Sequence, residues 1–131
     1  MSDPLPDGVP DGSDPAALAQ WLFDRARAGD TARVAAYVDA GAPVDMANEN
    51  GDTMLMLAAY RGHAETVRAL VERGADPGRA NDRGQTPLAG AVFKGEAEVV
   101  QVLLEAGADP DAGTPSARET ARMFGTGELL G

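Results

Sequence analysis

Apolar residues recur at helical spacing in the middle of the chain. Val67, Leu70 and Val71 lie three and four positions apart, which is the spacing of one helix face. A second apolar run follows at Val99, Val100, Val102, Leu103 and Leu104. An Ala- and Leu-rich stretch precedes each run, after a polar turn that contains glycine. The pattern predicts pairs of helices, a first and a second helix in each pair, separated by polar turns.

Residues that favour helix starts stand directly before the predicted first helices. Thr53 and Thr86 precede two of them, where a threonine oxygen can accept hydrogen bonds from free N–H groups. Pro87 then falls in the first turn, where its missing N–H does no harm. Ser116 and Glu119 have capping-box spacing and predict one more first helix near the end of the chain.

Glycines end the predicted helices and repeat at a fixed interval. The first helices are expected to end near Gly62 or Gly95 and the second helices at Gly74 or Gly107. The positions that recur after 33 residues are Gly29, Gly62 and Gly95; Gly41, Gly74 and Gly107; Gly51 and Gly84; Thr53 and Thr86; Leu70 and Leu103. Helix pairs repeated at this period must stack to bury their apolar faces, and stacking gives a solenoid.

Two segments carry this period most clearly, and they resemble the ankyrin repeat family. Residues 48–80 read NENGDTMLMLAAYRGHAETVRALVERGADPGRA, and residues 81–113 read NDRGQTPLAGAVFKGEAEVVQVLLEAGADPDAG. Residues 15–47 fit an N-terminal capping unit, and residues 114–131 fit a truncated last unit. The resemblance implies an all-α solenoid of helix-turn-helix units, joined by β-turn or hairpin-like loops, over residues 15–131.

The two central units depart from the family pattern in their first helices. The histidine that the family places after Thr-Pro-Leu is replaced by Met56 and Ala89. Gly90 stands in a predicted helix interior, where glycine costs about 0.5–1 kcal/mol relative to alanine. Gly90 is therefore either a weak spot in the helix or a site where a neighbouring helix or ligand approaches closely.

Residues 1–14 form an acidic N-terminal segment without helical periodicity. Proline and glycine recur throughout it, and Asp3, Asp7, Asp11 and Asp14 supply four negative charges. We expect this segment to be disordered. It serves either as a solubilising leader or as an acidic arm that folds over the basic residues of the repeat domain.

Composition and charge exclude several classes of function. The formal net charge of −10 argues against binding of nucleic acid or anionic membranes. Neither a signal peptide nor a spanning segment is apparent, which favours a cytoplasmic protein. Cysteine is absent, which removes disulfides and thiolate chemistry. The dominance of arginine over lysine and the abundance of alanine and glycine suggest a bacterial source.

No residues form a pattern typical of catalysis, a metal or a cofactor. His63, the single histidine, follows Gly62 at a predicted helix start, where a structural role in joining adjacent units is expected. Asp76, Asp109 and Asp111 follow Gly-Ala turns without the pattern of a calcium loop. The glycines do not form a phosphate-binding loop. The sequence therefore predicts a protein that is not an enzyme and needs no cofactor.

The resemblance implies a binding surface, because the family uses its concave groove and its turn tips for recognition. The residues that fall in the groove are Arg27, Tyr60, Arg61, Phe93, Lys94 and Met123. Those at the turn tips are Glu49, Asn50, Asp52, Asp82, Arg83 and Gln85. Tyr60 and Phe93 either anchor a partner or merely pack against their neighbours. An acidic stripe formed by Asp39, Glu65, Glu72, Glu98 and Glu105 is expected on the opposite, outer side.

These observations predict a module for noncovalent protein–protein interaction with an unknown protein partner. The alternative is a dedicated accessory or inhibitor subunit of one enzyme. Co-purification at a fixed ratio would distinguish such a subunit from a general binding module.

Overall fold

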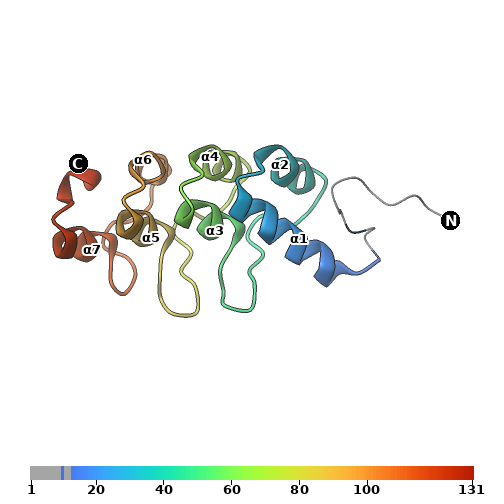
Figure 1. Cartoon of the computed structure of the whole chain (residues 1–131), viewed down its shortest axis with the longest axis horizontal. Coiled ribbons are helices and arrows are strands. Elements are labelled where there is room, and N and C mark those ends of the chain that lie inside the picture. The colour runs from blue at the N-terminus through green and yellow to red at the C-terminus, as the bar shows by residue number, and fades with distance from the viewer. Residues whose placement is uncertain (1–9, 11–12) are drawn as a thin grey trace.

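The computed structural model describes residue 10 and residues 13–131 (Figure 1). This part of the chain contains seven α-helices, one 3-10 helix and no named strand. The elements are α1 (Pro15–Ala28), α2 (Thr31–Asp39), α3 (Met54–Tyr60), α4 (Ala64–Glu72), α5 (Pro87–Lys94), α6 (Ala97–Glu105), α7 (Ala117–Phe124) and η2 (Gly127–Leu130). The predicted all-α class and the predicted pairing of helices are confirmed.

The helices form two parallel rows along the molecule (Figure 1). The first helices of the units, α1, α3, α5 and α7, pack against one another in chain order. The second row contains α2, α4, α6 and η2, which also pack in chain order. Each residue therefore lies beside its equivalent in the next unit, as expected of a solenoid.

The predicted helix starts agree with the capping contacts. The Thr53 hydroxyl accepts a hydrogen bond from Met56 N, and the Thr86 hydroxyl accepts one from Ala89 N, each at 3.2 Å. Pro87 occupies the first turn of α5. At α7 the Ser116 hydroxyl accepts from Glu119 N at 3.1 Å, and Ser116 N donates to Glu119 Oε1 at 3.0 Å. These local contacts explain why the first helices begin where they do.

Two glycines show why this residue is needed at the ends of the first helices: Gly95 ends a helix, and Gly29 leaves room for a side chain of the next unit. Gly95 ends α5 in the left-handed conformation, with φ of 71°, and its N–H donates to the carbonyls of Ala91 and Val92. Gly29 follows α1 with φ of 74°, and a Cβ there would lie 2.6 Å from His63 Nδ1. A side chain at residue 29 would therefore displace the imidazole of the next unit.

His63 joins the first two units, as the sequence predicted. Its Nε2 lies 2.8 Å from the carbonyl oxygen of Arg27 at the end of α1. The threonine hydroxyls of Thr31 and Thr66 add a second link between these units at 2.7 Å. The single histidine is therefore engaged in holding adjacent repeats together.

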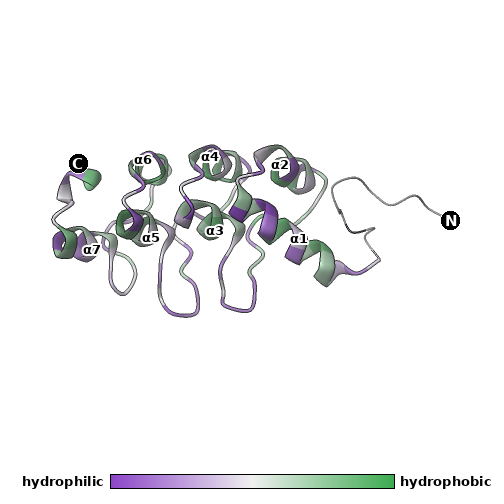
Figure 2. Ribbon diagram, in the orientation of Figure 1, coloured by the Kyte–Doolittle hydropathy of each residue, from purple (hydrophilic) through white to green (hydrophobic). Residues whose placement is uncertain are grey.

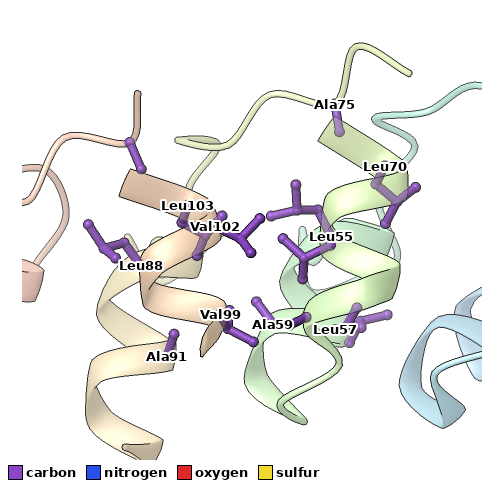
Figure 3. Packing of buried hydrophobic residues seen from close by; sticks show 14 of the residues in the cluster. Leu55, Leu57, Ala59, Leu70, Ala75, Leu88, Ala91, Val99, Val102 and Leu103 are labelled. Carbon is purple, nitrogen blue, oxygen red and sulfur yellow. The ribbon is translucent and has the colours of Figure 1, made fainter. Parts of the chain in front are cut away.

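The core is built from small and medium aliphatic side chains (Figure 3). Leu55, Leu70 and Leu103 are fully buried where α3, α4 and α6 meet. Ala59 and Ala91 are also fully buried, and their small size allows the first helices to approach closely. In Figure 2 the helices show alternating hydrophobic and hydrophilic stripes, whereas the loops include many hydrophilic residues.

The hairpin-like loops between units are connected by backbone and side-chain hydrogen bonds. Asp82 N donates to the Asn50 carbonyl at 3.1 Å, and Thr114 N donates to the Gly84 carbonyl at 3.0 Å. In the loop before α5, the Asn81 side chain accepts from Gln85 N at 3.0 Å. The same side chain donates to Asp52 Oδ1, in the loop before α3, at 2.9 Å. Neighbouring turn tips are thus held to one another.

The predicted disordered segment falls largely on residues 1–9, 11 and 12, which lie outside the described residues. Asp14, which the sequence analysis grouped with that segment, is the N-cap of α1. Its carboxylate accepts from Ala16 N at 3.0 Å and from Ala17 N at 3.3 Å.

Candidate functional site

Large apolar side chains are exposed on one surface of the described chain. They are Tyr60, Phe93, Met123 and Phe124, with exposed fractions of 41%, 54%, 67% and 54%. All four belong to the last turns of α3, α5 and α7. We call the surface formed by the last turns of the first helices and the adjoining turn tips the first-helix face.

Neighbouring units make ring contacts on this face. The rings of Phe93 and Phe124 meet edge-on, with centroids 5.5 Å apart. The ammonium group of Lys94 lies 5.2 Å from the centroid of the Tyr60 ring, which is within range of a cation–π contact. The aromatic side chains therefore contact their neighbours while their outer surfaces stay open to solvent.

A pocket of about 360 Å³ opens between α1, α3 and the turn tip before α5, which contributes Asn81, Arg83 and Gln85. We call it the cationic pocket. Its lining residues are Arg27, Asp52, Met56, Leu57, Tyr60, Arg61, Asn81, Arg83 and Gln85. Three arginines that are far apart in the sequence, Arg27, Arg61 and Arg83, line this pocket, and Asp52 is the one acidic residue among the lining residues.

The charges in the cationic pocket are only partly compensated. Arg27 Nη1 lies 2.8 Å from Asp24 Oδ1 on the same helix. In the described part of the chain, the guanidinium groups of Arg61 and Arg83 have no hydrogen bond or ion pair. Asp52 accepts a hydrogen bond from the Asn81 amide instead. The pocket is therefore a locally positive site on a chain of net charge −10.

A second pocket of about 320 Å³ lies beside the first, between α3, α5 and α7. We call it the apolar pocket. Its lining residues are Met56, Tyr60, Gln85, Ala89, Gly90, Phe93, Pro115, Thr120 and Met123. Met56, Tyr60 and Gln85 line both pockets, so the two pockets adjoin.

The structure brings most of the predicted binding residues together. Eight of the residues predicted from sequence line one or both pockets: Arg27, Asp52, Tyr60, Arg61, Arg83, Gln85, Phe93 and Met123. Lys94 lines neither pocket and lies over Tyr60. The turn-tip residues Glu49, Asn50 and Asp82 are exposed but do not line either pocket. The binding role of all these residues stays a prediction.

Sequence reasoning missed several lining residues. Met56 was noted as a departure from the family pattern but not as part of a binding site. Gly90 was interpreted as either a weak spot or a site of close approach by a helix or ligand, and it was not included among the binding residues. Asn81, which holds Asp52 and the turn tip before α5, was also missed. The signal was present in the repeat itself, since Gly90 stands 33 residues after Leu57 and removes a side chain at an equivalent position.

The outer surface of the second helices differs in character. The five acidic residues predicted there, Asp39, Glu65, Glu72, Glu98 and Glu105, are exposed. Asp39 accepts from Arg73 Nε at 2.9 Å, and this hydrogen bond raises the pKa of the Arg73 guanidinium. The outer surface is thus acidic and lacks the exposed aromatic residues of the first-helix face.

Within residues 10 and 13–131 there is no cluster of three or more His, Cys, Asp or Glu side chains arranged to hold a metal ion. None of the described helices has the length and apolar character needed to cross a bilayer.

Comparison with known proteins places the repeats in a family and finds a relative. A family model described as ankyrin repeats (3 copies) matches residues 22–114. A curated protein from Pseudomonas aeruginosa, named as an ankyrin repeat protein, is 47% identical over 45 residues. That alignment covers 34% of this chain and 26% of the relative, so the chain matches about a quarter of the relative's length.

Proposed function

Because the chain belongs to the ankyrin repeat family, whose repeats serve as protein-interaction modules, we propose that it binds a protein partner through its first-helix face. One observation carries the proposal. Every exposed large apolar side chain of the described residues lies in the last turns of α3, α5 and α7. An exposed apolar patch with a polar rim is typical of a protein-binding surface.

The residue types on this face support the same conclusion. Tyr, Phe, Met and Arg are enriched in the buried centres of protein interfaces. Tyr60, Phe93 and Met123 line the apolar pocket, and Arg61 and Arg83 line the adjoining cationic pocket. The hydrogen bonds that hold the turn tips to one another keep this surface ordered before a partner arrives, which reduces the entropy lost on binding.

The proposed activity is occlusion or assembly rather than chemistry. The residues that line the two pockets include three arginines and one aspartate, but no histidine or cysteine. The histidine of the chain is engaged between α1 and α4. Binding to a partner can block a site on that partner or hold it in a complex.

The first test identifies the partner and maps the surface of this chain that contacts it. The full chain is used for affinity capture from a lysate of the source cells, and mass spectrometry identifies the captured protein. Calorimetry then compares Tyr60→Ala and Phe93→Ala with Glu72→Ala and Glu105→Ala. We expect each aromatic substitution to weaken binding by about 2 kcal/mol or more, as for central aromatic anchors, and the acidic substitutions to have almost no effect.

Glu72 and Glu105 are suitable controls because they are exposed at the ends of the second helices, away from the pockets. Circular dichroism establishes that each variant is folded. A partner whose affinity depends on Glu72 or Glu105, and not on Tyr60 or Phe93, would contradict the proposed surface.

A further inference from the structure

The first-helix face offers two adjoining pockets of different chemistry. We propose that they bind one extended protein segment, with a carboxylate side chain in the cationic pocket and a large apolar side chain in the apolar pocket. This inference rests on the proposed protein-binding function and specifies the chemistry of the partner.

The cationic pocket is suited to a carboxylate. Arg61 and Arg83 present guanidinium groups that have no partner among the described residues, and Asp52 is held by Asn81. A guanidinium group can bind both oxygens of a carboxylate through paired N–H donors. A carboxylate bound in this pocket would therefore neutralise the guanidinium charges of Arg61 and Arg83, which the described residues leave unpaired.

The apolar pocket has the size and lining for a large apolar side chain. A cavity of roughly 150 Å³ is large enough to bind benzene, and this pocket has a volume of about 320 Å³. Met56, Phe93 and Met123 supply flexible thioethers and an aromatic ring around it. Methionine side chains adapt to the shape of a ligand, which favours binding of a leucine or phenylalanine side chain.

Gly90 forms part of the wall of the apolar pocket, where it carries no side chain. The equivalent residue of the preceding unit is Leu57, whose side chain lines the cationic pocket. At Gly90 an added Cβ would lie 3.4 Å from Tyr60 Cδ2 and 3.9 Å from Met56 Sδ, both of which line the pocket. A leucine at residue 90 would place its larger side chain among these walls and fill part of the space.

The spacing of the pockets indicates the form of the segment. The pockets belong to successive units, whose helices lie about 10 Å apart. In a polyproline II segment, residues three apart lie on the same side and are separated by about 9 Å. A carboxylate and an apolar side chain three residues apart can therefore enter the two pockets together.

The test uses synthetic peptides and the full chain labelled with ¹⁵N. The probe is acetyl-Gly-Ser-Glu-Pro-Pro-Phe-Ser-Gly-amide, in which two prolines favour the required backbone. One control peptide replaces Glu with Lys, and the other replaces Phe with Ala. We expect the probe to shift the backbone amides of Arg61, Gln85, Gly90 and Phe93, and each control peptide to bind roughly fivefold more weakly or worse.

Matched variants assign the contribution of each pocket. Arg61→Ala should weaken probe binding roughly fivefold, whereas Arg68→Ala should not, although both remove one exposed arginine from the same unit. Gly90→Leu should remove the preference for Phe over Ala and keep the preference for Glu over Lys. If Gly90→Leu is not folded, Met123→Ala replaces it, because Met123 is an exposed residue, and should weaken binding of the probe only.

Several outcomes would overturn the inference. Equal binding of the Glu and Lys peptides, or no saturable shift at millimolar probe, contradicts the proposed chemistry. If deletion of residues 1–13 shifts the pocket amides without any peptide, the occupant is this chain's own N-terminal segment. Shifts that depend on protein concentration alone would indicate a second copy of the chain. None of these results bears on the proposed function, which is decided by the alanine variants and the captured partner.

Discussion

Gly90 lies in the interior of α5 with ordinary helical backbone, so an alanine there meets no conformational barrier. Its Cβ would be in van der Waals contact with Tyr60 and Met56. We therefore predict that Gly90→Ala raises the free energy of unfolding by about 0.5–1 kcal/mol, because it reduces the entropy of the unfolded chain. Urea denaturation followed by circular dichroism measures the change.

Gly113→Ala is the matched comparison for this prediction. Gly113 has φ of 95°, and an added Cβ would lie 2.9 Å from Thr86 Cγ2 and 3.2 Å from the Gly84 carbonyl oxygen. Alanine should therefore destabilise the protein at residue 113. A lower denaturation midpoint for Gly90→Ala would show that the neighbouring side chains cannot adjust, and would favour the close-approach interpretation.

Glu119 is the residue whose ionisation is linked to the capping of α7. Hydrogen bonds from the Ser116 backbone and side chain lower the pKa of Glu119 below its ordinary value of 4.5. Because the pKa is lower in the folded state, this contribution to stability is present above pH 4.5 and is lost as the pH falls through the lowered value.

We predict that Glu119→Gln melts below the natural protein near neutral pH and that the two melting temperatures converge in acid, as the pH falls through the lowered pKa of Glu119. Glutamine keeps an acceptor for Ser116 N but lacks the charge. Glu49→Gln serves as control, since Glu49 is an exposed turn-tip residue outside any capping box. A constant difference between Glu119→Gln and the natural protein at all pH values would contradict the linkage.

At the residue scale, the repeat predicted which residues lie on the first-helix face, but it did not predict the two pockets there. Tyr60 and Phe93 were assigned to the binding face because they precede helix-ending glycines at equivalent positions. The apolar pocket is lined by Gly90 together with Met56 and Tyr60 from the preceding unit. Such an arrangement is tertiary, and no local pattern in one unit encodes it.

At the scale of elements, helix boundaries were predictable because capping is local chemistry. Thr53, Thr86 and Ser116 each accept a hydrogen bond from an amide three residues later, as their positions in the sequence indicated. The stacking order was predictable from the 33-residue period. The links between turn tips were not, since Asp82 N and the Asn50 carbonyl belong to different units.

The last unit, α7 and η2, is the element whose contribution can be measured directly. α7 packs on α5, and η2 packs on α6 with Leu129 and Leu130 partly buried against the core. We predict that ending the chain before residue 114 lowers the free energy of unfolding by more than about 2 kcal/mol, the scale of uncovering a buried aliphatic side chain. Urea denaturation and light scattering record the loss of stability and any aggregation.

A shorter deletion provides the control for the last unit. Removing residues 127–131 takes away η2 and leaves α7 in place, so an intermediate loss is expected. If the chain that ends before residue 114 unfolds like the full chain, α7 and η2 do not cover the preceding unit in any energetically useful way.

At the scale of the whole molecule, charge is distributed unevenly. The chain has a net charge of −10, and its acidic stripe lies on the second helices, whereas uncompensated guanidinium groups lie on the first-helix face. An acidic ligand is therefore repelled by the molecule at long range and attracted at short range. The repulsion depends on ionic strength more strongly than the attraction, because close pairs are screened less.

The N-terminal segment gives the last prediction, which tests this balance. Deleting residues 1–13 removes three aspartates and keeps Asp14, which α1 needs as its N-cap. The removed charges are tethered within reach of the first-helix face, because an extended chain spans about 3.3 Å or more per residue.

We expect the deletion to raise the affinity for the Glu-containing peptide about twofold to threefold near 0.01 M ionic strength, where the Debye length is about 30 Å. Near 0.5 M salt, where screening acts within about 5 Å, the two proteins should bind equally well. Calorimetry at both salt concentrations measures the difference, and equal affinity at low salt would show that the segment has no influence on binding and acts only as a solubilising leader.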